Sequence, residues 1–171
     1  MSQHSSAEYF LPFRLARQNQ VLAGRMSIEK MARLGECLYS NQAEVDYRLH
    51  FRQNEGGRYI VTGNISGSVD MVCQRCMQPV TYDVAANVAV AFVTSDAQAE
   101  RITEEYEPLI VEDDQVGLSE FIEDEVILAL PIVATHTDLD CQSWFKENPE
   151  PEFKEEPRKN PFAELAKLKQ S

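Results

Sequence analysis

Residues 45–52 read Val-Asp-Tyr-Arg-Leu-His-Phe-Arg, a stretch in which apolar and polar side chains alternate without interruption. A period of two is typical of a β-strand with one face in the core and the other in solvent. A turn with two glycines follows at residues 54–57, and the alternation resumes over residues 59–71. Because the connection is so short, the two strands are predicted to be antiparallel neighbours.

The second strand is followed by a short turn and a third alternating run, residues 80–92. The turn contains Cys73-Gln-Arg-Cys76 and therefore forms the tip of the second hairpin. Gly63 and Gly67 lie on the apolar face of the second strand, which indicates bends or close backbone approach in a curved sheet. The three runs together predict an antiparallel meander that is curved or barrel-like.

Two helices are expected beside this sheet. Ser27 can cap a helix over residues 28–39, and Ser119 can cap a second helix that ends before Pro131. Each carries apolar residues at the spacing of a helix with one buried side. The predicted fold class is therefore α+β.

The remaining short elements and the domain boundaries complete this prediction. Residues 9–15 and 108–111 are expected to be additional strands. Residues 1–145 are predicted to form a single domain, because 171 residues with 43% hydrophobic content suit one core. Residues 146–159 are rich in proline and charge and are predicted to be a mobile linker, and residues 160–171 a short amphipathic C-terminal helix.

The terminal helix has two interpretations that the sequence leaves open. Phe162 and Leu165 lie on one side of it, and a helix this short needs a surface to fold against. It either docks onto its own domain or acts as a tethered motif that binds a partner.

The charge of the chain is concentrated in one stretch. The net charge is −12, and residues 96–125 contain twelve acidic residues against Arg101 alone. A surface that follows phosphates would concentrate lysine and arginine instead. Such acidic stretches are commonly solvated faces, but Glu104, Glu105 and Glu107 are candidates for binding a basic partner.

Four residues have the chemistry of a metal site: Cys73, Cys76, His136 and Cys141. Zinc takes tetrahedral sulfur and nitrogen ligands, and a Cys-x-x-Cys at a hairpin tip can supply two thiolates. A thioredoxin-like redox pair is disfavoured, because a strand and not a helix follows the motif. The opening residues lack a basic region followed by an apolar stretch, so no export signal is expected and a disulfide is disfavoured as well. Zinc or another thiophilic metal competes with an unliganded structural role.

No catalytic constellation is recognisable in the sequence. The histidines lack a Ser, Cys or Asp partner at a familiar spacing, and there is no glycine-rich phosphate loop. We therefore expect neither an enzyme nor a small-molecule substrate. The longest purely apolar run is nine residues with a proline, too short to span a bilayer, so no membrane partner is expected.

Arg75, between the two cysteines, could contact phosphate or carboxylate, although an ordinary exposed turn arginine is the simpler interpretation.

Several segments resemble the bacterial YceD family. They are Cys73-Gln-Arg-Cys76-Met-Gln-Pro-Val, Tyr106-Glu-Pro, the run Glu-Asp-Glu-Val-Ile-Leu-Ala-Leu-Pro-Ile-Val at 123–133, His136, Cys141, and Asn-Pro-Phe-Ala-Glu-Leu-Ala-Lys-Leu-Lys at 160–169. Their order and spacing cover most of the chain from about residue 40 onward. The resemblance implies a cytoplasmic, metal-binding protein linked to the accumulation of 23S ribosomal RNA, through its synthesis, processing or stability.

This chain departs from the family pattern at one point. Many members carry another pair of cysteines after the Leu-Pro segment, whereas here only His136 and Cys141 follow it. Two mechanisms are compatible with the resemblance. The protein contacts a ribosomal protein or large-subunit assembly factor through its acidic stretch and terminal helix, or it binds pre-23S rRNA directly through Arg48, Arg52 and Arg75. A zinc-stabilised adaptor for another cytoplasmic complex is the remaining alternative.

Overall fold

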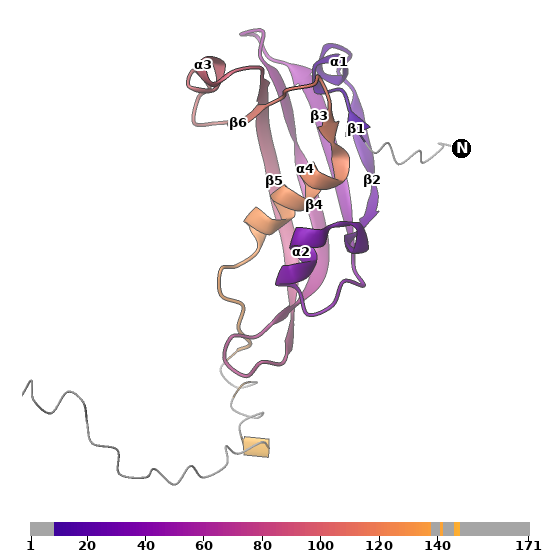
Figure 1. Cartoon of the computed structure of the whole chain (residues 1–171), viewed down its shortest axis with the longest axis vertical. Helices are drawn as coiled ribbons and strands as arrows, with labels where there is room; N and C mark the ends of the chain where they lie inside the picture. Colours follow the sequence, from indigo (N-terminus) through magenta and orange to yellow (C-terminus); the bar gives the residue numbers. More distant parts are fainter. Residues whose placement is uncertain (1–8, 138–140, 142–145, 148–171) are drawn as a thin grey trace, which may run out of the picture. The chain divides into compact units, whose positions relative to one another are not determined.

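The computed structural model describes residues 9–137, 141 and 146–147. The chain divides into two units, Met1–His136 and Thr137–Ser171, and the first contains the helices and strands labelled in Figure 1. The predicted terminal helix, with Phe162 and Leu165, lies outside the described residues, as does nearly all of the predicted linker. The predicted division at residues 145 and 159 therefore stays a prediction.

A five-stranded sheet forms the framework of the first unit. Its strands lie in the order β2 (Val21–Ser27), β3 (Glu44–Gln53), β4 (Tyr59–Val72), β5 (Pro79–Val93) and β6 (Glu107–Ile110). Neighbours are antiparallel from β2 to β5, and β6 runs parallel to β5. The predicted α+β meander is confirmed, and the sheet is open and not a closed barrel. The sequence prediction missed β2.

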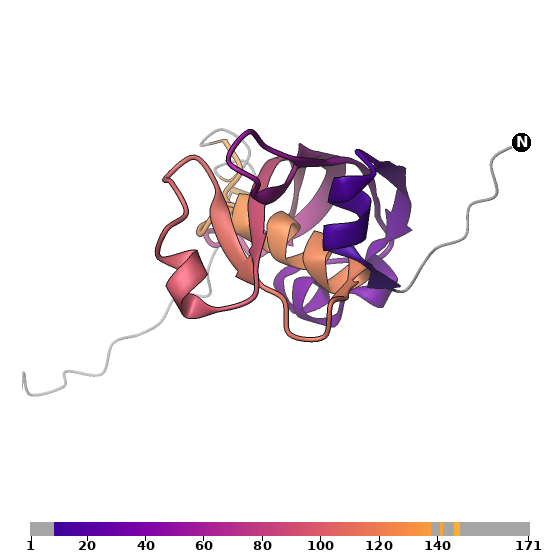
Figure 2. The ribbon, with the colours of Figure 1, turned by 90° about the horizontal axis from the view of Figure 1, so that it is seen from above.

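The sheet is curved, and helix α4 (Leu118–Ala129) lies on its concave side when the unit is viewed from above (Figure 2). Gly63 contributes to the close pairing of β3 and β4. A Cβ atom there would collide with the backbone carbonyl oxygen of Arg48 on the neighbouring strand. This is the close backbone approach that the position of the glycine in the strand predicted.

The helices differ from the prediction in their bounds. The first expected helix is divided into η1 (Ile28–Lys30) and α2 (Ala32–Cys37), because Met31 between them has the non-helical angles φ −110° and ψ 87°. Ser27 does cap η1, since its hydroxyl accepts the Glu29 N–H at 3.3 Å. The second expected helix is α4, which ends before Pro131 as predicted.

Residues 9–15 form a single strand in the prediction, and this is wrong. Only β1 (Tyr9–Phe10) is extended, paired with β7 (Val116–Gly117), and α1 (Pro12–Arg17) follows directly. Pro12 occupies the first turn of α1, where its missing N–H costs no hydrogen bond. A further short helix, α3 (Asp96–Ala99), precedes β6. In the described residues, no helix is long and apolar enough to cross a membrane.

Four phenylalanines lie at the centre of the core: Phe10, Phe51, Phe92 and Phe121. They come from β1, β3, β5 and α4, and the ring of Phe10 meets that of Phe51 edge to face with centroids 5.3 Å apart. Such pairs contribute about 1 kcal/mol beyond their buried area. The cluster fixes the position of α4 against the sheet, which decides where the side chains on either side of this helix lie.

Glu123 connects α4 to α2 from inside the protein, with only 5% of its surface exposed. Its carboxylate accepts the backbone N–H of Leu34 at 2.9 Å and two N–H groups of Arg33 at 2.9 and 3.2 Å. Burial raises the pKa of this carboxyl, but these hydrogen bonds outweigh burial and hold the pKa below its usual value. Glu123 therefore stabilises the first turn of α2, where backbone N–H groups need partners.

Candidate metal centre and acidic pocket

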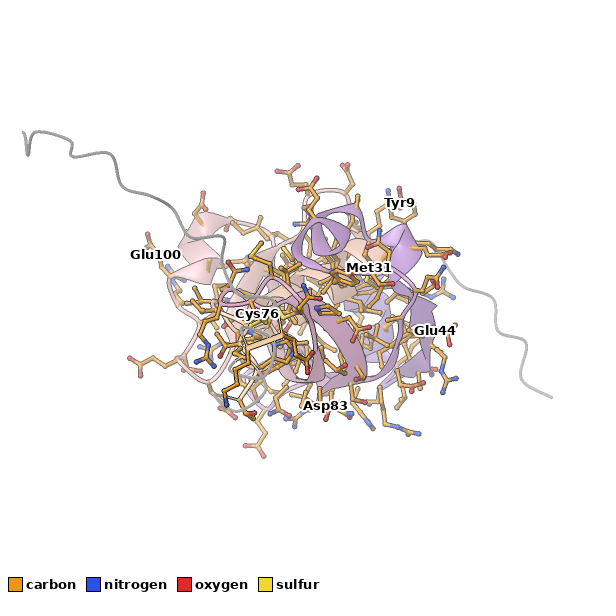
Figure 3. All side chains as sticks on the ribbon, turned by 90° about the horizontal axis from the view of Figure 1, so that it is seen from below. Tyr9, Met31, Glu44, Cys76, Asp83 and Glu100 are labelled. Carbon is orange, nitrogen blue, oxygen red and sulfur yellow. The ribbon has the colours of Figure 1, made fainter. Side chains whose placement is uncertain are left out.

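The turn between β4 and β5 is closed by its own backbone. The Cys73 N–H donates to the Gln78 carbonyl, and the Met77 N–H donates to the Cys73 carbonyl, both at 2.9 Å. Met77 takes a left-handed conformation with φ 59°, which turns the chain back toward β5. Both Cys73 and Cys76 are buried. Figure 3 views the unit from below, the end that carries this turn, and labels Cys76.

The segment that follows α4 is bonded to this turn. The backbone N–H of Gln74 donates to the Ala134 carbonyl at 2.9 Å. The Arg75 guanidinium donates to the His136 carbonyl at 2.6 Å. These bonds bring His136 beside two cysteines that lie sixty residues earlier in the chain. Arg75 is exposed, and part of its guanidinium serves this contact within the unit.

The ring of His136 is oriented for ligation through one nitrogen. Its Nε2 lies 2.9 Å from the Pro79 carbonyl oxygen, which can only accept, so Nε2 carries the proton and donates. Nδ1 is the nitrogen that faces the cysteines, 3.4 Å from the Cys76 sulfur, and in the neutral ring it is the unprotonated one. A carbonyl that holds the other ring N–H is the usual arrangement for a histidine that binds a metal.

The surroundings of Cys73 favour its thiolate form. Burial raises the pKa of the Cys73 thiol, but backbone N–H groups of Cys76, His136 and Arg75 and the His136 side chain together lower it to about 5. The His136 N–H donates to this sulfur at 3.4 Å. A thiolate is the form of cysteine that binds a metal ion.

The ligand atoms of Cys73, Cys76 and His136 lie within 4.8 Å of one another. Ligands at about 2.0–2.3 Å from a tetrahedral zinc ion are separated by roughly 3.5–3.8 Å, so a small rearrangement would suffice. The cluster of sulfur and imidazole nitrogen in the first unit could therefore hold a metal ion. The predicted fourth ligand, Cys141, belongs to the second unit, and its part in the site stays a prediction.

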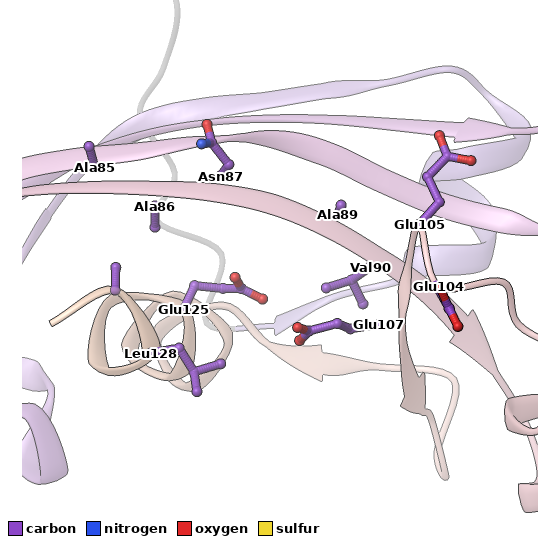
Figure 4. Close-up of a pocket in the computed structure, with 11 residues that line it drawn as sticks. Ala85, Ala86, Asn87, Ala89, Val90, Glu104, Glu105, Glu107, Glu125 and Leu128 are labelled. Atoms are coloured by element: carbon purple, nitrogen blue, oxygen red, sulfur yellow. The ribbon is translucent and has the colours of Figure 1, made fainter. Parts of the chain in front are cut away.

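An acidic pocket of about 330 Å³ lies beside the middle of β5 (Figure 4). Its sides come from β5, from the chain at the start of β6, and from α4. The lining includes Ala85, Ala86, Asn87, Ala89, Val90, Glu104, Glu105, Glu107, Glu125 and Leu128. The three predicted partner-binding glutamates are thus brought together in one pocket. Among the described residues none of these glutamates forms an ion pair.

Glu125 was not among the predicted site residues. It is half-buried in this pocket, and Figure 4 shows Glu125 and Glu107 below β5. Burial, then the charges of Glu107 and Asp124, raise the pKa of the Glu125 carboxyl to about 7. Its position three residues after the buried Ile122 places it at the border of the buried side of α4, which is a signal the sequence does contain.

The bases of the alternative RNA-binding surface do not converge. Arg48 and Arg52 are exposed on β3, opposite Asn64 and Ile60 of β4. Arg75 lies beyond the end of β4 at Val72. At about 3.3 Å per residue, the eight residues from Asn64 to Val72 separate Arg48 from the turn by about 26 Å.

Comparison with known proteins gives one family. A family profile described as "Large ribosomal RNA subunit accumulation protein YceD" matches residues 61–169 of the chain. The large ribosomal RNA subunit accumulation protein YceD of Haemophilus influenzae is 30% identical over 162 residues, which cover 93% of this chain and 93% of the relative. No solved structure gives a significant match.

Proposed function

This chain belongs to the YceD family, and on that premise we propose that it supports the accumulation of 23S rRNA as a binding protein and not as an enzyme. The observation that carries this proposal is the family match, because it extends over nearly the whole length of both chains. We place its action in the bacterial cytoplasm, on precursors of the large ribosomal subunit.

The proposed partner is a ribosomal protein or a large-subunit assembly factor with a basic surface. Support comes from Glu104, Glu105 and Glu107, which are exposed and lie in one pocket. Opposite charges across an interface raise the association rate and select the partner, and salt weakens both effects. The predicted terminal helix, with Phe162 and Leu165, would add a second, tethered contact.

Zinc is the proposed metal, and its role is structural. Cys73, Cys76 and His136 would hold it together with Cys141 of the second unit. The support is the low pKa of the Cys73 thiol and the Pro79 carbonyl, which holds the His136 Nε2 and so directs Nδ1 toward the Cys76 sulfur. The bound ion would supply a fixed connection between the β4–β5 turn and the segment after α4. Elemental analysis of protein purified without chelator should then find close to one equivalent of zinc, and less than about a tenth would contradict the proposal.

Co-sedimentation tests the ribosomal role. Lysate of a strain with a tagged chromosomal copy is separated on a sucrose gradient, and the protein is expected in the fractions of precursor large subunits. Deletion of the gene is expected to reduce 23S rRNA relative to 16S rRNA. A protein that stays at the top of the gradient, in a strain whose 23S rRNA is independent of it, would contradict the proposal.

Nuclease treatment separates protein contact from direct RNA contact. The tagged protein is captured with its partners before and after digestion of exposed RNA. We expect partner proteins to remain after digestion, because the proposed contact uses carboxylates. Loss of every partner after digestion would favour direct binding of pre-23S rRNA through Arg48 and Arg52.

A further inference from the structure

Strand β5 is paired along nearly its whole length on one side and only at its end on the other. On the first side, β4 pairs with residues 79–92 of β5. On the second side, β6 pairs only with residues 90–93. Among the described residues, no backbone group pairs with residues 80–88 on this second side, whereas the Val90↔Glu107 pairing takes up the Ala89 carbonyl. A stretch of strand edge therefore remains open between the metal cluster and β6.

The register identifies which backbone groups are open. The β4–β5 ladder runs without a bulge, so alternate residues of β5 direct both N–H and C=O away from β4. Pro79 and Val93 belong to this outward set, because their carbonyls accept from His136 and from the Val111 N–H. The outward residues between them that β6 leaves open are Thr81, Asp83, Ala85 and Asn87, together with the N–H of Ala89. Their N–H and C=O groups recur at every second residue, which is the spacing at which another extended chain could pair with them.

The acidic pocket lies directly beside this open edge. Small side chains at Ala85, Ala86 and Ala89 leave space along the strand. Carboxylates of Glu107 and Glu125 lie on the far side of the space (Figure 4). Leu128, with 71% of its surface exposed, adds an apolar surface at the same place. An occupant would meet backbone hydrogen-bonding groups on one side, and negative charge with an apolar contact on the other.

We propose that residues 81–89 of β5 accept an extended, basic segment of another protein as an additional strand. Main-chain hydrogen bonds to the outward groups would supply affinity, and lysine or arginine side chains of the segment would reach Glu104, Glu105, Glu107 and Glu125. Strand addition to an open sheet edge is an established mode of peptide recognition. The inference rests on the proposed function, since it specifies how the basic partner docks.

Two other occupants fit the edge less well. A second copy would bring its own carboxylates against these, because residues 96–125 carry a net charge of −11. The basic tail of this chain, residues 157–171, has its apolar residues at helical spacing, whereas a strand at this edge requires a period of two.

Peptide binding to the full-length protein tests the inference. The probe is a fluorescent peptide of alternating lysine and valine, and the control peptide alternates glutamate and valine. Fluorescence anisotropy is expected to show salt-sensitive binding of the lysine peptide only. Methylation of alternate backbone nitrogens, in the register that faces β5, is expected to abolish it. Chemical shifts of backbone amides should change over residues 81–89 and not along β2.

A pair of proline variants locates the binding edge. The Asn87 N–H points away from β4, so Asn87→Pro removes an outward donor without breaking the β4–β5 ladder. Ala23→Pro is the matched control, because by the same register the Ala23 N–H points outward from β2, at the opposite edge of the sheet. We expect Asn87→Pro to weaken binding of the lysine peptide at least about tenfold and Ala23→Pro to leave it unchanged.

Several results would overturn the inference. They are equal binding of the glutamate peptide, equal binding of the methylated peptide, or shifts confined to another surface. Lysine-peptide binding that appears only after removal of residues 148–171 would show that the tail is the occupant, and dimerisation through β5 would show that a second copy is. If Asn87→Pro does not fold, the methylated peptide decides alone. Co-sedimentation with precursor subunits that survives in folded Asn87→Pro would reject this docking mode while leaving the ribosomal function standing.

Discussion

Strand β5 has two regions that differ in how their polar groups are satisfied. The first region is the beginning of β5, where a turn precedes Pro79. There the cysteine sulfurs and His136 are bonded to one another and to backbone groups of the same unit. In the middle of β5, the outward backbone groups of residues 81–87 are unpaired among the described residues, and Ala85 and Asn87 line a pocket whose described carboxylates form no ion pair. Closed polar networks stabilise a fold, whereas open ones are available to a partner.

Two glutamates of α4 repeat this contrast within one turn of helix. Glu123 is buried and bonded to Arg33 and Leu34, so its charge is compensated. Glu125 is half-buried beside Glu107 and Asp124, so its charge is opposed. The same side-chain type is thus stabilising on one side of the helix and costly on the other. The surroundings of each carboxylate, and not its residue type, therefore decide whether it serves the fold, as Glu123 does, or is available to a partner, as Glu125 is.

The largest expected effect comes from breaking the metal cluster. Cys73→Ser should remove the proposed metal and lower the free energy of unfolding by about 4 kcal/mol, because a buried ligand set is left without its ion. Denaturant unfolding with and without chelator measures this. Cys37→Ser is the control, since Cys37 is exposed and lies outside the cluster. Equal stability of the two variants would show that the turn needs no metal.

The second largest effect is expected for Glu123→Ala, which should lower the free energy of unfolding by about 2–3 kcal/mol. The substitution leaves the Leu34 N–H and the Arg33 guanidinium without their shared acceptor. Glu120→Ala removes an exposed acid from the same helix and should cost less than about 1 kcal/mol. If the two variants unfold at the same denaturant concentration, Glu123 does not connect α4 to α2 energetically.

Glu125→Gln should change stability in the opposite direction. Between the usual pKa of 4.5 and about 7, the folded state holds a proton that the unfolded state has lost, so the free energy of unfolding falls as pH rises. The variant should be more stable than the natural chain by about 1 kcal/mol at pH 8, after allowance for solvent screening of a half-buried group. At about pH 4, below both pKa values, the two should nearly coincide. A difference that does not depend on pH would contradict the raised pKa.

The smallest effect on stability is expected at the mouth of the pocket. Glu104→Gln, Glu105→Gln and Glu107→Gln in one chain should change the free energy of unfolding by less than about 0.5 kcal/mol, because all three are exposed. Thermal unfolding measures this. A loss of more than about 2 kcal/mol would show that these carboxylates belong to the closed part of the structure.

Local patterns in the sequence were enough for much of the fold. The alternation over residues 45–52 identified β3, and similar patterns identified β4 and β5. The sequence of β2, Val-Leu-Ala-Gly-Arg-Met-Ser, does not alternate, and pairing with β3 determines its structure. The prediction of an extended segment over residues 9–15 gave too little weight to Pro12, whose preference for the first turn of a helix is a local signal.

The candidate site was also predictable from the sequence only in part. Residue type and spacing singled out Cys73, Cys76 and His136, and the structure places them together. The Pro79 carbonyl that orients the imidazole could not be found in advance, because any residue type supplies a carbonyl. The open edge of β5 could not be found either, since it depends on how far β6 extends along its neighbour.

Complementation of a strain that lacks the gene tests the central claim most directly. The readout is the ratio of 23S to 16S rRNA, with the chain carrying Glu104→Gln, Glu105→Gln and Glu107→Gln compared with a control carrying Glu112→Gln, Asp113→Asn and Asp114→Asn. Both remove three negative charges, but only the first set lines the acidic pocket. We predict that the control restores the ratio and that the folded pocket variant does not. Full restoration by the pocket variant would contradict the account.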